Sequence, residues 1–341
     1  MISRLKRPLL LILLAILSIG GVRIIEINNS QDIAFKPLNL DPAHPGKRRI
    51  GELIFEGAWQ LDSRNENFGG ISGLTLLPEG RFVGISDAGT LIGFGLSNNA
   101  QIDRPFIAPL PGSTGPDLDY KDRDSEGIAH DAHSGQFWVS YEANHAIRRF
   151  SRSFSRVSGV ARPAEMQEWP ENRGAEALIR LRDGRFIVIA ESVDDGTHQA
   201  LLFSGDPVEK GSVVSRFTYR PPAGYRVTDG VQLADGRLAL IHRSIGLPDG
   251  FAAKIGLLQP SLIAKGKIVE SRIVATLTSP LLVDNLEGIA TEENGGNTYI
   301  WLISDNNFFV LQRTILMKFR LAEKADTKKP EAEPAPGFES L

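Results

Sequence analysis

The sequence predicts an all-β fold, a single β-propeller of five four-stranded blades. Two observations predict it. A unit of two short apolar strands joined by a glycine turn recurs five times, at intervals of 50 to 58 residues; the units begin at Ser72, Glu126, Glu176, Asp229 and Glu287. Beyond the first residues of the chain, no long segment has the helical period. A repeat near 50 residues with only β patterning is typical of propellers, whose blades stand around a central axis.

Composition excludes several classes of protein. The 341 residues are 42% apolar, enough for a large core. The net charge of −3 argues against a nucleic-acid partner, because binding phosphates requires an excess of Lys and Arg. The chain has no cysteine, which excludes disulfides, zinc–thiolate sites and cysteine nucleophiles.

Residues 1–27 read as a signal peptide or an N-terminal membrane anchor. Arg4, Lys6 and Arg7 precede an uncharged run over 9–22. As a helix that run covers about 21 Å, less than the roughly 30 Å of a bilayer core, which favours a signal. No small-x-small cleavage site follows it, which favours an anchor. In either case we expect the body to be exported, periplasmic or secreted, and the anchor would attach it to the inner membrane.

The next segment, 28–49, is rich in proline and ends in basic residues, which predicts a linker. The propeller is predicted over 50–321. A disordered tail over 322–341 follows, since its Pro, Ala, Glu and Lys cannot bury enough apolar surface to order.

Each repeat is a hairpin whose turn contains glycine, as at Glu79-Gly80, and glycine supplies the positive φ that tight turns require. The first unit continues with strands near 90–96 and 102–109. The fifth unit has three strands, the third near Ile315–Leu321, and lacks a fourth. We therefore expect an N-terminal strand at Gly51–Leu61 to close the last blade. A sixth blade would need a further repeat or a different strand count.

Candidate site residues follow from the antiparallel hairpin. The start of its first strand and the end of its second lie on one rim, so these side chains should meet at one mouth of the axial channel. The pairs are Ser72 with Asp87, Glu126 with Glu142, Glu176 with Glu191, Asp229 with His242-Arg243, and Glu287 with Asp305. So many carboxylates need protons, arginines or a hard cation such as Ca²⁺ to share one space.

Each acid also has a structural interpretation, because repeated acids can bond backbone amides of the next blade. The departures from symmetry favour function: Ser72 replaces one acid, and His242-Arg243 replaces another. The acidic loop that ends at Asp124 lacks the EF-hand pattern and could contribute one ligand. His130 and His133 have metal-like spacing but are more typical of a turn.

Three arginines accompany the acids. Arg123, Arg173 and Arg226 each precede the acid of their blade by three residues. They could pair with that carboxylate or grip an anion in bidentate fashion.

The segments Ile71-Ser72-Gly73-Leu74, Asp124-Ser125-Glu126-Gly127-Ile128, Gly174-Ala175-Glu176-Ala177-Leu178 and Asn285-Leu286-Glu287-Gly288-Ile289 carry a family resemblance. Over roughly residues 50–321 the chain resembles the phytase-like domain family, described as having esterase-like activity, of exported bacterial proteins. The resemblance implies a calcium-assisted hydrolase acting on a small-molecule ester or phosphate ester.

The resemblance also implies roles for the rim residues. Hard cations would be held by Glu126, Glu176, Glu287, Asp305 and Asp87. Substrate would be bound by Arg123, Arg173 and Arg226, and Glu176, His242 and Arg243 would be catalytic, with Arg243 on the phosphate oxygens.

Two other functions remain open from the residues alone. A propeller of this kind can bind a ligand or protein partner without catalysis. It can also be a metal-dependent lactonase, with one cation on the axis and a base such as His242.

Overall fold

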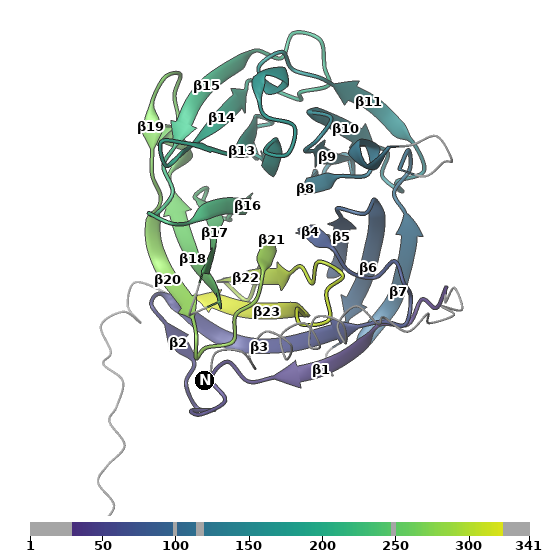
Figure 1. Cartoon of the computed structure of the whole chain (residues 1–341), viewed down its shortest axis with the longest axis vertical. Coiled ribbons are helices and arrows are strands. Elements are labelled where there is room, and N and C mark those ends of the chain that lie inside the picture. Colours follow the sequence, from purple (N-terminus) through teal and green to yellow (C-terminus); the bar gives the residue numbers. More distant parts are fainter. Residues whose placement is uncertain (1–28, 98–100, 114–118, 247–249, 323–341) are drawn as a thin grey trace, which may run out of the picture.

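Five sheets, antiparallel except for one short parallel pair, stand in a ring around a central axis in the computed structural model (Figure 1). The structure describes residues 29–97, 101–113, 119–246 and 250–322. The predicted five-bladed propeller is confirmed. The helices in these segments are single 3₁₀ turns: η1 (Tyr120–Asp122), η2 (Met166–Glu168) and η3 (Pro260–Leu262). The predicted signal or anchor and all but the first residue of the predicted tail lie outside the described residues. No helix among the described residues is long and apolar enough to span a membrane.

Each blade runs from an innermost to an outermost strand. Blade one is β4 (Ile71–Leu76), β5 (Arg81–Ser86), β6 (Thr90–Leu96) and β7 (Ile102–Pro109). Blade two is β8 (Ser125–His130), β9 (Phe137–Tyr141), β10 (Ala146–Phe150) and β11 (Val157–Ala161). Blade three is β12 (Ala175–Arg180), β13 (Phe186–Asp194), β14 (Thr197–Phe203) and β15 (Val214–Tyr219). Blade four is β16 (Arg226–Gln232), β17 (Leu238–Gly246), β18 (Gly250–Leu258) and β20 (Arg272–Thr278). Blade five is β21 (Leu286–Asn294), β22 (Asn297–Ser304), β23 (Thr314–Leu321) and β3 (Leu53–Asp62).

The ring closes in blade five, where the first long strand meets the last one. Strand β3 pairs antiparallel with β23, from Leu53 opposite Leu321 to Leu61 opposite Thr314. Figure 1 shows the purple β3 lying beside the yellow β23. The predicted N-terminal closing strand is therefore present, one to two residues later than expected.

The segment predicted as a linker contains strands. Within it, β1 (Ala34–Leu38) pairs with β3 as a fifth strand of blade five, and β2 (Arg49–Ile50) also pairs with β3. Phe35 stacks on Trp59 at 5.2 Å. Proline suits such an edge strand, whose outer backbone groups face solvent. A further short strand, β19 (Ile268–Val269), adds to β15 and joins blade three to the connection of blade four.

The core consists of five apolar clusters, each between two neighbouring blades. Near the axis the inner strands approach closely through glycine. A Cβ at Gly127 would lie 2.7 Å from the Leu178 nitrogen, and one at Gly73 would lie 2.7 Å from the Glu126 carbonyl oxygen. This contact explains why the repeats begin with an acid followed by a small residue.

Candidate active site

The inner strand of every blade begins with a β-bulge, which turns one side chain out of the strand's alternation. The bulge positions hold Ser72, Glu126, Glu176, Thr228 and Glu287. Two of them are hydroxyls that donate to the next blade: Ser72 Oγ to Ser125 O at 2.5 Å, and Thr228 Oγ1 to Leu286 O at 3.1 Å. The three glutamates are left to supply the acids of the channel mouth.

Blade four therefore corrects the sequence alignment by one residue. Thr228, not Asp229, is equivalent to the glutamates. The Asp229 carboxylate accepts from Gly230 N at 2.7 Å and from Ile289 N at 3.0 Å in the next blade. Burial raises the pKa of Asp229 well above its usual value, against the lowering effect of these two amides. Asp229 therefore has a structural role: it accepts hydrogen bonds from backbone amides, one of them in the next blade, which is the alternative interpretation given for each acid.

The second rim position directly follows the second strand in blades one, two and five, and lies within β13 and β17 in blades three and four. It holds Asp87, Glu142, Glu191, Arg243 and Asp305. In the four blades with an acid there, its backbone amide donates to the residue two before the bulge: Gly70, Asp124, Gly174 and Asn285. The repeated hydrogen bond holds both rim positions together, so the predicted convergence at one mouth is present.

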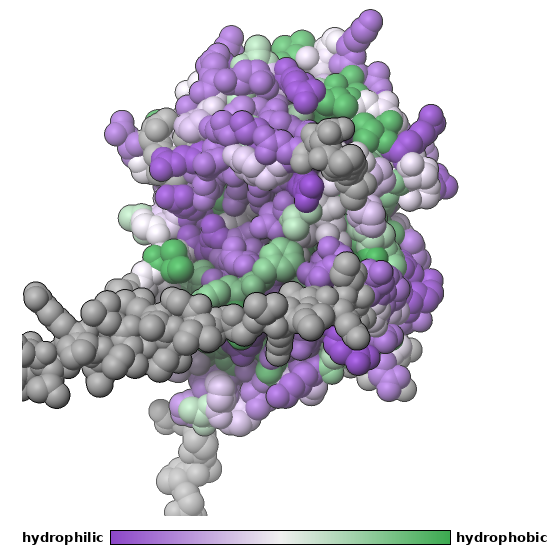
Figure 2. Space-filling view, turned by 45° about the vertical axis from the view of Figure 1, so that its right-hand side comes forward, coloured by the Kyte–Doolittle hydropathy of each residue, from purple (hydrophilic) through white to green (hydrophobic). Residues whose placement is uncertain are grey.

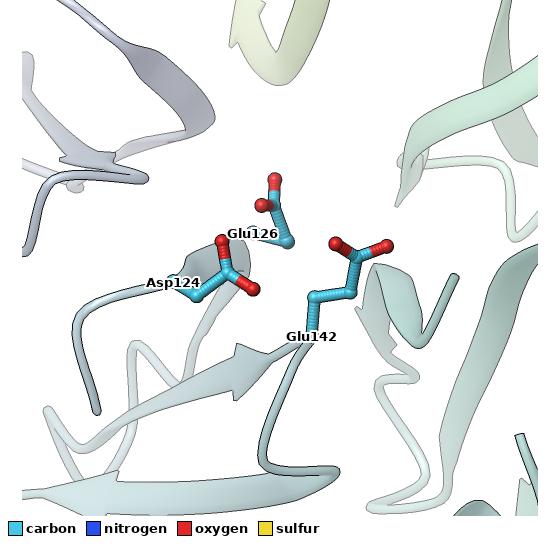
Figure 3. A group of neighbouring side chains, drawn as sticks. All are labelled: Asp124, Glu126 and Glu142. Carbon is cyan, nitrogen blue, oxygen red and sulfur yellow. The ribbon is translucent and has the colours of Figure 1, made fainter. Parts of the chain in front are cut away.

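Three carboxylates of blade two form a tight acidic group among the residues that the structure describes. One oxygen from each of Asp124, Glu126 and Glu142 lies within 4.8 Å of the others. Figure 3 shows the three side chains turned toward a shared space. Asp124 Oδ2 accepts from Ala143 N at 2.9 Å and Glu142 Oε1 from Gly174 N at 3.1 Å, which fixes both groups and leaves each a second oxygen. Several carboxylate oxygens at this spacing fit a hard cation such as Ca²⁺.

Sequence reasoning found this group only in part. It named Glu126 as a ligand, placed Glu142 on the rim, and treated Asp124 as the end of an acidic loop. The observation that would have identified Asp124 is its position relative to the bulge. Asp124 occupies the site two residues before the bulge, where the other blades have Gly70, Gly174, Arg226 and Asn285.

The positive charge of the mouth comes from blade four. Arg243 Nη1 donates to Asn285 Oδ1 at 2.6 Å and to Glu287 Oε1, and its Nη2 lies 4.0 Å from Glu191 Oε1. Arg226 Nη1 donates to the same Glu191 oxygen at 2.8 Å. The arginine that replaces an acid in blade four thus bridges carboxylates of blades three and five.

Burial sets the protonation of this mouth. It raises the pKa of Glu126 and of Glu176 well above the usual value, with added repulsion from neighbouring carboxylates. Burial, then Asp124 and Glu191, raises the pKa of Glu142 to about 7. Burial and Glu287 raise the pKa of Asp305 to about 8. Near neutral pH the mouth therefore retains protons that a bound cation would displace.

Burial also raises the pKa of Asp87 and of Glu287, the latter against the lowering effect of Arg243. For Arg243 itself, burial lowers the pKa, but Glu287 and Glu176 outweigh it and the pKa is raised. Glu126, Glu176, Glu287, Asp305 and Asp87, the five predicted ligands, thus lie around one mouth, although Asp124 and Glu142 are the residues that join Glu126 in the tight group.

Two predicted substrate arginines lie outside the ion pairs of the mouth. Arg123 and Arg173 are exposed, and the Cβ of Arg123 lies against Gly89. In the corrected register they precede the bulge by three residues, in the loop before the inner strand, whereas Arg226 precedes it by two. This difference of one residue explains why only Arg226 reaches a rim carboxylate.

His242 does not reach the mouth. Its Nε2 lies 2.5 Å from the Tyr219 hydroxyl and its Nδ1 lies 3.1 Å from Lys254 O. Burial lowers its pKa to about 4. Successive residues of a strand point to opposite faces, so Arg243 enters the mouth while His242 enters the packed interior. The expectation that His242 is a base is not supported.

The opposite end of the axis holds a cavity of about 1180 Å³. The ends of the inner strands line it, including His130 and Arg180, and so does the turn residue His133. Arg180 pairs with Asp131 at 3.1 Å, and Lys318 pairs with Glu292 at 2.8 Å. The rim acids Glu126, Glu176 and Glu287 do not line this cavity, so the candidate site is placed by those acids rather than by this cavity.

Comparisons with known proteins give one family match and several similar structures. Residues 66–308 match the model of a family described as Phytase-like: Esterase-like activity of phytase. No curated protein matches the chain. The glutaminyl cyclase of Myxococcus xanthus aligns with a TM-score of 0.46 and 16% identity, covering 79% of this chain and 96% of that chain. The Malassezia sympodialis allergen Mala s 1 aligns with a TM-score of 0.41 and 13% identity, covering 80% and 91%.

Proposed function

The chain belongs to the phytase-like family, and on that premise we propose that it is a calcium-dependent hydrolase of carboxylic or phosphoric esters, with its active site at the acidic mouth. The observation that carries the proposal is the group of Asp124, Glu126 and Glu142, in which one oxygen from each residue lies within 4.8 Å of the others, and Glu126 also interacts with the charge of Arg243. The basic and apolar N-terminal sequence supports action outside the cytoplasm.

The three carboxylates would hold Ca²⁺, which supplies a Lewis acid for the ester oxygen and lowers the pKa of a bound water. Gly174 N and Ala143 N keep two of these groups oriented before any cation arrives. Oriented ligands reduce the reorganisation that binding requires.

Arg226 and Arg243 are the residues that would contact an anionic substrate. Arg226 is exposed and uses one N–H group on Glu191, which leaves further donors for phosphate or carboxylate oxygens. Arg243 is held by Asn285 and Glu287, so its contribution is a fixed positive charge.

Proton transfer falls to the buried acids. Asp305, with a pKa of about 8, holds a proton at neutral pH and could give it to the leaving oxygen. Glu176, whose pKa burial also raises, is the second candidate for this role. A lactonase with His242 as base is disfavoured, because both ring nitrogens of His242 are hydrogen-bonded in the interior.

The test is an assay of the purified protein on 4-nitrophenyl phosphate and 4-nitrophenyl butyrate, with calcium and then with chelator. We expect chelator-sensitive turnover of at least one ester, lowered about a hundredfold or more in Glu126→Gln. Glu79→Gln is the matched control, since Glu79 is exposed at the β4–β5 turn. Turnover that survives both the chelator and Glu126→Gln would overturn the proposal. A calcium-dependent rise in Tm without turnover would indicate a binding propeller.

A further inference from the structure

Blade five exposes a run of four apolar residues beside the mouth. In the loop between β22 and β23, the exposed fractions are 48% for Phe308, 50% for Phe309, 90% for Val310 and 78% for Leu311. The described surface seen in Figure 2 is mostly hydrophilic, with separate hydrophobic spots. A continuous apolar run on such a surface marks a contact with something else.

The loop is held in this conformation by specific bonds. Asn306 Oδ1 accepts from Phe308 N and from Gly70 N of blade one, both at 3.1 Å. Asn307 Nδ2 donates to Gln312 Oε1 at 2.6 Å, across the base of the run. Asn307 and Phe308 have φ of 47° and 49°, a left-handed conformation that a phenylalanine rarely adopts. The apolar residues are therefore presented by a built loop at a conformational cost.

The run is continuous with the site. The loop begins at Asp305, whose Oδ1 accepts from Asn307 N at 2.7 Å. A Cβ added to Gly70 would collide with both the Phe308 ring and the Asp87 carboxylate, so ring and carboxylate lie against the same glycine. An apolar wall thus adjoins the acids of the mouth.

We propose that the Phe308–Leu311 loop binds the apolar chain of an amphiphilic ester whose polar end lies among the mouth carboxylates. This inference rests on the proposed hydrolysis, which supplies the reaction. The loop supplies the substrate class. The carboxylates that would hold a cation for the polar end lie beside the exposed side chains that would accept the apolar chain, as an amphiphile requires. A bilayer surface is the alternative occupant, which the test below distinguishes.

The test uses the full chain with calcium and three kinds of measurement. The first is kcat/KM on 4-nitrophenyl acetate, butyrate and octanoate, with the corresponding alkyl phosphates as a second series. The second is calorimetric binding of butylphosphonate and decylphosphonate, which are not hydrolysed. The third is co-sedimentation with phosphatidylcholine vesicles. The variant is Val310→Ser/Leu311→Ser, and the matched control is Val213→Ser, which lies 64% exposed before β15 in blade three.

We expect the wild type and the control to prefer the long chain, and the loop variant to lose about tenfold on long chains while short chains are unchanged. Loop-dependent binding of decylphosphonate without turnover of any ester would uphold this inference while refuting the proposed hydrolysis. Turnover with the same dependence on chain length in variant and wild type would refute the inference alone. A variant that loses only its co-sedimentation with phosphatidylcholine vesicles would also refute it, in favour of a membrane contact.

Discussion

The backbone amide of Val227 in blade four donates to Nε2 of His198 in blade three at 3.2 Å. Because Nε2 accepts, the proton of this neutral imidazole is on Nδ1, which lies 2.7 Å from Ala190 O. Ala190 directly precedes the rim residue Glu191, and Val227 directly follows Arg226. The histidine therefore joins two blades directly beneath the Arg226–Glu191 ion pair, and it does so only when uncharged.

Removing the Tyr219 hydroxyl should destabilise the protein. In Tyr219→Phe the buried Nε2 of His242 loses its closest partner at 2.5 Å and keeps only Ser271 Oγ at 3.4 Å. We expect a loss of about 1–3 kcal/mol in the free energy of unfolding. Urea titration measures it, with Tyr225→Phe as the control. Equal stability of the two variants would contradict the role of this hydroxyl.

His242 should make stability fall with acid. Burial lowers its pKa to about 4 in the folded protein, below the usual 6.5. Between these values the unfolded chain binds a proton that the folded chain does not, so this contribution is full above pH 6.5 and is lost as the pH falls toward 4. We expect it to reach about 3 kcal/mol. The measurement compares unfolding of the wild type and His242→Gln from pH 7 to 4; curves that stay parallel would refute it.

Calcium should stabilise the protein more at pH 8.5 than at pH 6. The pKa of Glu142 is raised to about 7, so this ligand keeps its proton in acid and loses it as the pH rises. Without calcium the sign is opposite: the raised pKa gives stability at low pH that is lost as the pH rises through 7. Thermal melts with calcium and with chelator at both pH values test this. In Glu142→Gln we expect the calcium effect to fall sharply, and a rise in Tm that is independent of pH would count against the site.

Arg243 should stabilise the folded protein mainly by pairing with the buried carboxylate of Glu287. Arg243→Met leaves that carboxylate without its cation, and we expect a loss of about 3–5 kcal/mol. Glu287→Gln in the same chain should restore a part of it, since the amide carries no charge. A double-mutant cycle by urea unfolding gives the coupling. Additive effects of the two changes would show that the pair is not coupled.

Gly127 should tolerate no side chain. In Gly127→Ala the new Cβ would lie 2.7 Å from the Leu178 nitrogen of the next blade, where only backbone can move. We expect a loss of about 1–3 kcal/mol. Gly205→Ala is the matched control, because a Cβ there meets nothing within 4 Å. Unfolding midpoints that agree between the two variants would refute the close contact.

The sequence predicted the fold well because the repeat is a local pattern. The hairpin of Ile71–Ser86 can be recognised from apolar alternation and one glycine turn, and five copies specify a ring. The site was harder, because it depends on a bulge. In blade four the bulge position is Thr228, so Asp229 lies outside the acid ring and Arg226 lies two residues before the bulge, and no apolar pattern records where a bulge falls.

The strands of the predicted linker were missed for a related reason. Strand β1 (Ala34–Leu38) has only two partly buried residues, and the other three are exposed. It is a strand because its backbone pairs with β3. Such an edge strand depends on a partner already in place. The position of His242 was also missed, because the face of the strand decides where its side chain points. Its nearness to Arg243 in the chain does not.

The pairing of Leu53–Asp62 with Thr314–Leu321 has a consequence for synthesis. One partner is among the first residues of the propeller to be made and the other is the last, so the ring cannot close on a partial chain. A chain truncated before Thr314 would leave the edge of β3 that pairs with β23 without a partner, although β1 would still pair with its other edge, and blade five would expose its apolar face. The complete fold is thus available only to a finished polypeptide, and premature termination should yield aggregation-prone fragments rather than smaller propellers.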